Sequence, residues 1–157
     1  MQPNVLDGQV LAEETQSGRL WGVIILAAMV GPGISVIFYP TAPARFGLGV
    51  AIVIGAGAFA MAWGGFQYRF RSNGVEIRTL GFRLRWIPKE SIVSYAVEPW
   101  TFFRGYGIRG IGRNRAYVWG NRVVHIRTTK GEVFVGHSDP EQIVRDLNMV
   151  TGFVTRG

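Results

Sequence analysis

The sequence of 157 residues contains no cysteine. This absence excludes disulfide bonds, thiolate nucleophiles and cysteine-ligated metal sites. Only two histidines are present, His125 and His137, and no third candidate ligand accompanies either of them in the sequence. Two ligands do not make a metal site. We therefore predict neither a metal site nor a cofactor.

Charged residues are absent from two long stretches near the N-terminus. The segments Leu20–Tyr39 and Gly47–Phe66 each contain 20 residues without Asp, Glu, Lys or Arg. A helix of about 20 apolar residues covers the roughly 30 Å hydrocarbon core of a bilayer. A core helix of a soluble domain would carry a polar stripe, which both segments lack. The sequence therefore predicts an integral membrane protein with two transmembrane helices.

Residues 40–46 connect the two apolar segments, and so short a connection can only join antiparallel neighbours. We therefore predict a transmembrane hairpin over residues 20–66. A signal peptide is the alternative for the first segment, with cleavage near residues 41–44. Three features count against it: the segment is too long, the region before it contains Asp7, Glu13 and Glu14 and is not a positively charged n-region, and a second apolar segment follows.

Positive charge is concentrated after the hairpin. Of the 17 Lys and Arg residues, 15 follow residue 66, together with 7 of the 10 acidic residues, so this part has a net charge of +8. Arg45 is the only charged residue of the connection, and Arg19 precedes the first segment. Because basic segments remain cytoplasmic, we predict an inner (plasma) membrane protein with both termini, including segment 1–19, in the cytoplasm. The charge can also indicate a face turned toward anionic lipid or nucleic acid.

Small residues recur at every fourth position of the second apolar segment. Two such lines are Ala56, Ala60 and Gly64, and Gly47, Ala51 and Gly55. Small side chains let helix backbones approach closely. We predict a packing seam against the first helix, with self-association as the alternative. The sequence Gly-Pro-Gly at 31–33 predicts a kink in the first helix.

Residues 67–152 have the pattern of a mostly β domain, followed by a tail at 153–157. Short alternating segments and turn signals predict about seven antiparallel strands, at 68–72, 75–80, 82–87, 91–98, 115–119, 121–128 and 132–136. In 82–87, apolar residues alternate with Arg83 and Arg85, which predicts one buried face. A helix is predicted to begin after Asp139, with Pro140 in its first turn and Leu147 on its apolar face.

Three segments resemble a known family. They are the strands that open directly after a membrane segment (68–92, YRFRSNGVEIRTLGFRLRWIPKESI), the Gly-rich segment 105–109 and the closing run 131–143. They resemble the bacterial pleckstrin-homology-like membrane proteins, which pair transmembrane segments with such a domain. The resemblance covers roughly residues 68–150 and the hairpin. It implies a seven-stranded, partly open barrel with a C-terminal helix at one end, and it implies no particular chemistry.

Catalytic motifs are weak in this sequence. His137, Ser138 and Asp139 are adjacent, but neither triad nor elbow spacing surrounds Ser138. The glycines between 105 and 112 have predicted strands on both sides, where a dinucleotide-binding loop needs a helix after it, and the aromatic residues Phe102, Phe103 and Tyr106 intervene. We therefore predict no catalytic and no cofactor-binding residue, and a protein that is not an enzyme.

Basic and aromatic side chains on the strands and on the connection 99–114 are the candidate contacts with the membrane surface or a partner. They are Arg69, Arg71, Arg83, Arg85, Phe102, Phe103, Arg104, Tyr106, Arg109, Arg113 and Arg115. Each basic residue adds about 1 kcal/mol of attraction to an anionic membrane surface, and Arg and aromatic residues are enriched at binding hot spots. The alternative is that the aromatic residues cap the β core and the arginines are solvated.

These features predict a non-enzymatic, membrane-anchored interaction module at the cytoplasmic face. Its ligand would be a protein partner, another copy of the chain, or anionic lipid head groups. One alternative is a membrane-associated enzyme that acts on lipid, for which Ser138, His137 and Asp139 would have to form the site. Another is a nucleic-acid-binding membrane protein, because basic and aromatic residues occur together. The hairpin makes nucleic acid the less expected partner.

Overall fold

The computed structural model describes residues 8–38 and 41–152, and the chain divides into two compact units. One unit, which we call the β domain, combines the N-terminal segment up to Gln16 with the chain from Phe66 onward. The other, the helical unit, comprises Ser17–Gly65. The predicted tail at 153–157 and part of the predicted connection, residues 39–40, lie outside the described residues.

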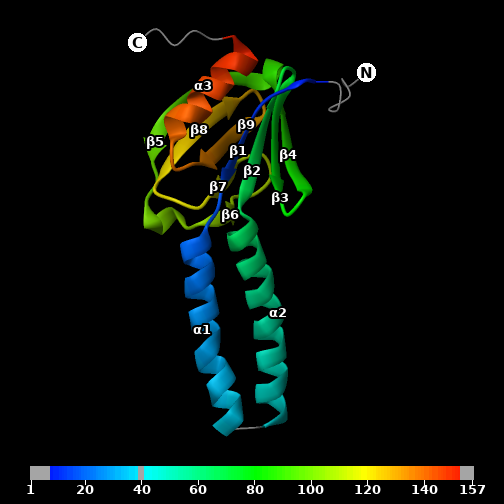
Figure 1. Ribbon diagram of the computed structural model, residues 1–157, viewed down its shortest axis with the longest axis vertical. Helices are drawn as coiled ribbons and strands as arrows, with labels where there is room; N and C mark the ends of the chain where they lie inside the picture. Colours follow the sequence, from blue (N-terminus) through cyan, green and yellow to red (C-terminus); the bar gives the residue numbers. More distant parts are fainter. Residues whose placement is uncertain (1–7, 39–40, 153–157) are drawn as a thin grey trace. The chain divides into compact units, whose positions relative to one another are not determined.

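The helical unit consists of two helices that lie side by side, α1 (Arg19–Phe38) and α2 (Ala42–Gly64) (Figure 1). The sequence predicted a helix from Gly47, but α2 begins five residues earlier. Its start is capped by Thr41, whose side-chain oxygen accepts a hydrogen bond from the Ala44 amide at 3.4 Å. Arg45 therefore lies in the first turn of α2 rather than in a loop. The α1 helix is continuous through Pro32.

One helix, α2, is long and apolar enough to cross a membrane. Its Pro43–Gly64 segment has 22 residues, and its most apolar stretch of 18 residues has a mean hydropathy of 2.0 and is only 11% buried. The exposed side chains of α2 include Val53 and Ile54, and those of α1 include Leu20 and Leu26. Apolar side chains therefore cover the outside of the helical unit.

The β domain contains two sheets. The first has four antiparallel strands in the order β1 (Val10–Gln16), β2 (Phe66–Arg71), β3 (Gly74–Thr79) and β4 (Phe82–Pro88). The second has five strands in the order β5 (Ile92–Pro99), β8 (Arg122–Thr128), β9 (Gly131–Gly136), β7 (Arg115–Val118) and β6 (Gly107–Arg109). Two 3-10 turns, η2 (Lys89–Ser91) and η3 (Phe102–Arg104), flank β5.

This arrangement corrects the predicted barrel in three respects. The described residues form nine strands rather than seven, and they form two sheets rather than the predicted partly open barrel. One pairing is parallel, between β7 and β9. The additional strands are β1, which comes from the segment 1–19, and β6, which lies in the predicted connection 99–114. Both were missed because neither has the alternating apolar pattern of a buried strand.

The C-terminal helix α3 (Pro140–Thr151) is confirmed, with Asp139 as its N-cap and Gly152 as a left-handed C-cap. Its buried face contributes Ile143, Leu147 and Val150 to one core that also contains residues of both sheets. Within that core the hydroxyl of Tyr68 on β2 donates a hydrogen bond to the Tyr117 carbonyl oxygen on β7 at 3.1 Å. Burial raises the pKa of Tyr68 well above its usual value, and the nearby Tyr117 adds to the shift.

A register shift between Ile77 and Arg78 breaks the predicted alternation of β4. Ile77 pairs with Arg85, but the next residue, Arg78, pairs with Arg83, so Leu84 is an extra residue in the ladder. Phe82 pairs with Thr79 in the last pair before the turn, at the end of the sheet. Phe82 was predicted to be buried, and it is 74% exposed.

Candidate interaction surface

The predicted Gly-rich connection after β5 is anchored to the second sheet by Trp100. The Trp100 amide donates to the Asn121 carbonyl oxygen at 2.7 Å, and its indole nitrogen donates to the Gly105 carbonyl oxygen at 2.8 Å. Its ring lies 5.3 Å from that of Phe134 on β9. Tyr106 and Phe134 pack against a small hydrophobic cluster that contains Trp100. We had not predicted a role for Trp100, because an aromatic residue at a strand end carries no signal of where it packs.

Two neighbouring residues of this segment face outward. Phe103 is 96% exposed, and the Arg104 guanidinium lies 5.3 Å from the centre of the Trp100 ring, a cation–π geometry. The side chain of Phe102, the third predicted contact here, lies outside the described part of the structure. The predicted aromatic group is therefore divided, since Tyr106 belongs to the core and Phe103 does not.

The turn between β6 and β7 has a fixed shape. Gly110 has a positive φ of 89°, and a Cβ atom there would lie 2.2 Å from the Asn114 carbonyl oxygen. The Asn114 side-chain oxygen accepts a hydrogen bond from the Glu132 amide at 3.0 Å. The Arg85 guanidinium of β4 donates to the Arg113 carbonyl oxygen at 2.8 Å. This last contact brings the edge of the first sheet against the turn.

Four predicted arginines lie on β4 or on and around this turn, and we call them the arginine surface: Arg85, Arg109, Arg113 and Arg115. The Arg109 Nε donates to the Tyr106 carbonyl oxygen at 2.9 Å. Arg109 and Arg113 are exposed, and Arg85 and Arg115 are half-buried. No described carboxylate forms an ion pair with any of the four. Their charges are therefore available to a ligand.

Arg69 and Arg71 were predicted to face the membrane, and the structure gives both of them carboxylate partners. Arg69 lies 3.1 Å from Glu13 on β1, and Arg71 lies 3.5 Å from Glu76 on β3. Arg71 also donates to the Gly8 carbonyl oxygen at 2.9 Å. These charges are largely balanced within the domain. The sequence could not indicate this, because the pairing depends on the register of β1 and β3 with β2.

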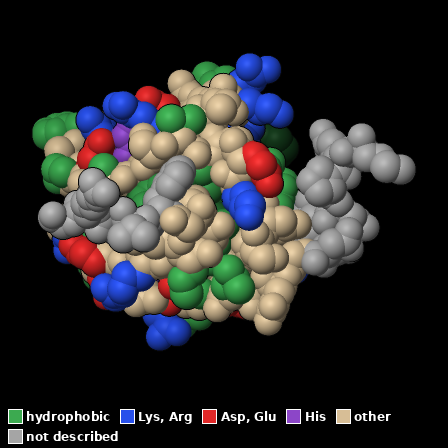
Figure 2. All heavy atoms as spheres, turned by 90° about the horizontal axis from the view of Figure 1, so that it is seen from above, with side chains coloured by type: hydrophobic (Ala, Val, Ile, Leu, Met, Phe, Trp, Pro, Cys, Tyr) green, Lys and Arg blue, Asp and Glu red, His purple; other side chains and the backbone are tan. Residues whose placement is uncertain are grey.

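The face of the molecule in Figure 2 shows basic and acidic side chains interspersed with apolar ones. Several of the ion pairs within the β domain join exposed groups, such as Arg122 with Glu141 and Arg145 with Asp139. The net positive charge of the domain is therefore not spread evenly. It is carried by the arginines that have no described acidic partner.

The residues of the two predicted small-residue lines differ in exposure. Ala56 and Gly64 are exposed and Ala60 is half-buried, whereas Gly55, from the second small-residue line, is buried. A Cβ atom on Gly55 would lie 2.6 Å from the Met29 sulfur of α1. One close contact between α1 and α2 is therefore at Gly55, which belongs to the second predicted line.

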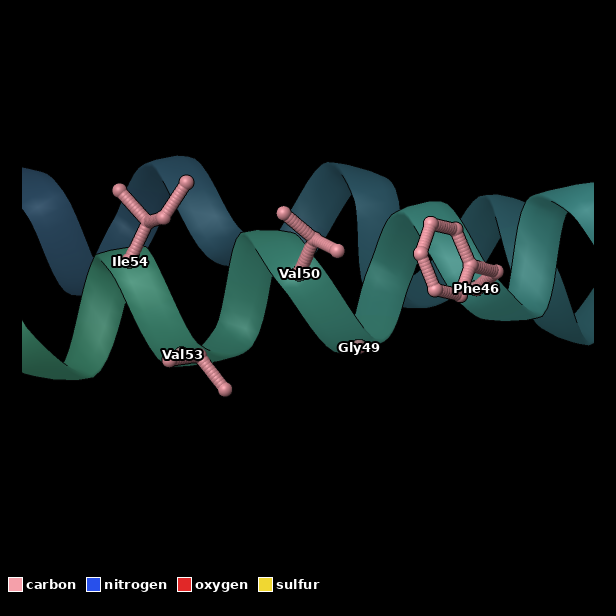
Figure 3. Close-up of a pocket in the computed structure, with 5 residues that line it drawn as sticks. All are labelled: Phe46, Gly49, Val50, Val53 and Ile54. Atoms are coloured by element: carbon pink, nitrogen blue, oxygen red, sulfur yellow. The ribbon is translucent and has the colours of Figure 1, made fainter.

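A groove of about 460 Å³ runs along α2, lined by Phe46, Gly49, Val50, Val53 and Ile54 (Figure 3). Its lining contains no charged or hydrogen-bonding side chain. Apart from Gly49, which has no side chain, the lining residues are large and apolar. A surface of this composition is typical of a helix face in contact with lipid.

The two histidines are held by structural contacts. His125 Nδ1 lies 2.9 Å from a Glu98 carboxylate oxygen, and its ring stacks on Phe134 with centroids 4.3 Å apart. His137 Nδ1 lies 2.8 Å from the Asp139 backbone oxygen, and Nε2 lies 3.5 Å from Glu14. The described residues contain no group of three or more His, Cys, Asp or Glu residues suited to a metal ion.

Asp146 is a buried carboxylate on α3. One oxygen accepts a hydrogen bond from the Gln142 side chain at 3.0 Å, and the other has no hydrogen-bond partner among the described residues. Burial raises the pKa of Asp146 above its usual value. A carboxyl whose pKa is higher in the folded state than in the unfolded state binds protons more tightly when folded. It therefore lowers stability as pH rises above the unfolded-state pKa.

Comparisons with protein-family models, with curated proteins and with solved structures found no match. The function proposed below is therefore argued from the geometry of this chain alone.

Proposed function

We propose that this chain is a membrane-anchored, non-enzymatic interaction module whose arginine surface binds an acidic protein surface. The observation that carries the proposal is the division among the arginines. Arg69 and Arg71 have carboxylate partners, whereas Arg85, Arg109, Arg113 and Arg115 have none among the described residues. Unpaired guanidinium groups held by an ordered turn are suited to bidentate contacts with carboxylates.

The anchor in this proposal is the helical unit, with α1 and α2 as a two-span hairpin. Three features support it: α2 is long and apolar enough to span, α1 is also uncharged after Arg19, and large apolar side chains on both helices are exposed. The β domain on the C-terminal side carries most of the basic residues, which favours the cytoplasm. Both termini are then cytoplasmic.

Reporter fusions test this topology. A cytoplasmically active reporter fused after Gly157 should be active, and the same reporter inserted between α1 and α2 at residues 39–41 should be inactive. A periplasmically active reporter should give the reverse result at both positions. Periplasmic activity after Gly157 would contradict the orientation, and equal results at both positions would contradict the two-span hairpin.

The arginine surface is tested with the variant Arg85→Gln, Arg109→Gln, Arg113→Gln and Arg115→Gln in the full-length protein. After cross-linking in cells, we expect co-purified partner proteins to fall about tenfold or more, as hot-spot losses above about 1.4 kcal/mol would require. The matched control changes three exposed arginines that already have acidic partners, Arg122, Arg127 and Arg145, to Gln.

The control variant should co-purify the same partner proteins as the parent. Capture of partners by the parent protein should weaken as the salt concentration is raised, because salt screens exposed charges. An identical set of partners at identical yield in the parent and the four-site variant would show that the arginine surface is only solvated.

A further inference from the structure

Two strands of the β domain continue almost directly into the helices. β1 ends at Gln16 and α1 begins after two further residues. Only Gly65, the C-cap of α2, separates the end of α2 from Phe66, where β2 begins. Gln16 and Phe66 are paired in the first sheet. We call the end of the β domain at which these two residues lie the connection end (Figure 1).

The turn between β3 and β4 lies at the connection end. Gln67, the neighbour of Phe66, pairs with Arg78, and Thr79 pairs with Phe82, so the turn between Thr79 and Phe82 follows directly. Both large apolar side chains here are exposed, Leu80 by 47% and Phe82 by 74%. Leu80 lies within the turn and Phe82 directly follows it, at the end of the sheet.

The exposed η3 turn lies at the same end of the second sheet. The Gln16 side chain exchanges two hydrogen bonds with the backbone of Trp119, at 3.1 and 3.2 Å. Two residues further on, the Asn121 carbonyl oxygen accepts the hydrogen bond from Trp100 that anchors the chain just before η3. Phe103, which is 96% exposed, therefore belongs to the connection end as well.

The charges around these apolar side chains are positive. Arg83 follows Phe82 and Arg104 follows Phe103, and both arginines are exposed and have no ion pair with a described carboxylate. The exposed carboxylates where α3 begins are neutralised: Glu141 pairs with Arg122, and Asp139 lies 3.4 Å from Arg145.

From these positions we infer that Leu80, Phe82 and Phe103 insert into the head-group region of an anionic bilayer, with Arg83 and Arg104 against lipid phosphates. The inference rests on the membrane hairpin proposed above. Linkers of two residues and one residue then keep Gln16 and Phe66 within about 10 Å of the ends of the spanning helices. Apolar side chains flanked by Lys or Arg are the composition of surfaces that lie in a membrane interface.

The turn of the arginine surface is not part of this contact, although the Arg109 side chain folds back to the Tyr106 carbonyl oxygen. The turn that contains Ile111 and Arg113 lies at the opposite end of β7, because β7 runs from Arg115 toward Trp119. It contacts the turn at Gly131, which joins the ends of β8 and β9 remote from the connection end. Lipid and protein ligands are therefore assigned to different ends of the β domain.

The absence of cysteine makes a direct test possible, because a single introduced thiol is the only one in the chain. The full-length variants Phe82→Cys, Phe103→Cys and Ile111→Cys are each labelled with an environment-sensitive fluorophore. They are then reconstituted in nanodiscs of phosphatidylcholine with or without phosphatidylglycerol. Ile111 is the matched control, because it is equally apolar, 93% exposed and at the opposite end of β7.

With phosphatidylglycerol present, we expect labels at 82 and 103 to be blue-shifted and quenched by spin-labelled lipid. We also expect them to be at least threefold less accessible to aqueous iodide than the label at 111. Labels at 82 and 103 that are as accessible to iodide as that at 111 would overturn the inference. Shielding from iodide without quenching by spin-labelled lipid would indicate a protein contact and would also overturn it.

A separate measurement distinguishes this failure from failure of the proposed anchor. Alkaline carbonate should leave the parent chain in the membrane fraction. A chain that carbonate extracts would contradict the hairpin, and the inference with it. A chain that stays in the membrane but has accessible labels would contradict only the lipid contact.

Discussion

The variant Leu147→Asp is expected to lower the free energy of unfolding of the β domain by about 4 kcal/mol or more. Leu147 is fully buried on α3, in the core shared by both sheets. The substitution removes a large apolar side chain and replaces it with a carboxylate that has no basic group built to receive it. Both effects act in the same direction.

Urea unfolding of the detergent-solubilised full-length protein, followed by pulse proteolysis, measures the change. With a typical slope of about 2 kcal/mol per molar urea, the midpoint should fall by about 2 M. Met149→Asp is the matched control, because Met149 lies on the same helix and is 55% exposed. That variant should change stability by less than about 0.5 kcal/mol. Equal midpoints for Leu147→Asp and the parent would mean that α3 does not dock on the sheets.

The second large effect is expected at Glu76, the acidic member of a buried ion-pair group. Its carboxylate lies 3.5 Å from Arg71 and 3.9 Å from Arg78, and its side chain is only 7% exposed. Glu76→Gln preserves shape but leaves the Arg71 guanidinium largely buried without a counter-charge. Removing one partner of a buried pair typically costs about 3 kcal/mol.

Glu13→Gln is the matched control for this experiment, since it makes the same substitution in the more exposed pair with Arg69. Its cost should be below about 1 kcal/mol, because water screens the pair. In the double variant Arg71→Met and Glu76→Leu, apolar groups replace the pair, and much of the stability lost in Glu76→Gln should return. Equal losses in Glu76→Gln and Glu13→Gln would contradict the buried pair.

The proposed ligands follow from the same distinction between paired and unpaired charge. An arginine that already neutralises a buried carboxylate, such as Arg71, costs stability when removed and offers little to a ligand. An arginine without an acidic partner, such as Arg113, costs little stability when removed and is free to bind. Stability and binding measurements on these two groups should therefore give opposite patterns.

Local signals in the sequence were sufficient for several elements. The lack of charge over 20–39 and 47–66 predicted long apolar helices. The absence of a polar stripe can be recognised in the sequence alone, because it does not depend on any tertiary contact. The turn signal Asn73–Gly74 placed the β2–β3 hairpin, and Asp139–Pro140 placed the start of α3. In each case the determining interaction lies within a few residues along the chain.

Other features depended on pairing between distant segments, and only the tertiary structure decided them. The segment before the helices joins the sheet as β1 because its backbone pairs with β2, across more than 40 intervening residues. Phe82, which strict alternation had placed inside, pairs with Thr79 beside the turn at the end of the sheet and is exposed.

The candidate site shows the same division. The sequence itself determined that the protein is rich in arginine after residue 66 and that aromatic and basic residues share the connection 99–114. It could not determine which arginines are neutralised, because Glu13 and Glu76 reach Arg69 and Arg71 only through strand register. Nor could it separate Phe103 from the arginine surface, which depends on the direction of β7 within the sheet. Composition is a property of the chain, whereas charge balance and exposure are properties of the packed fold.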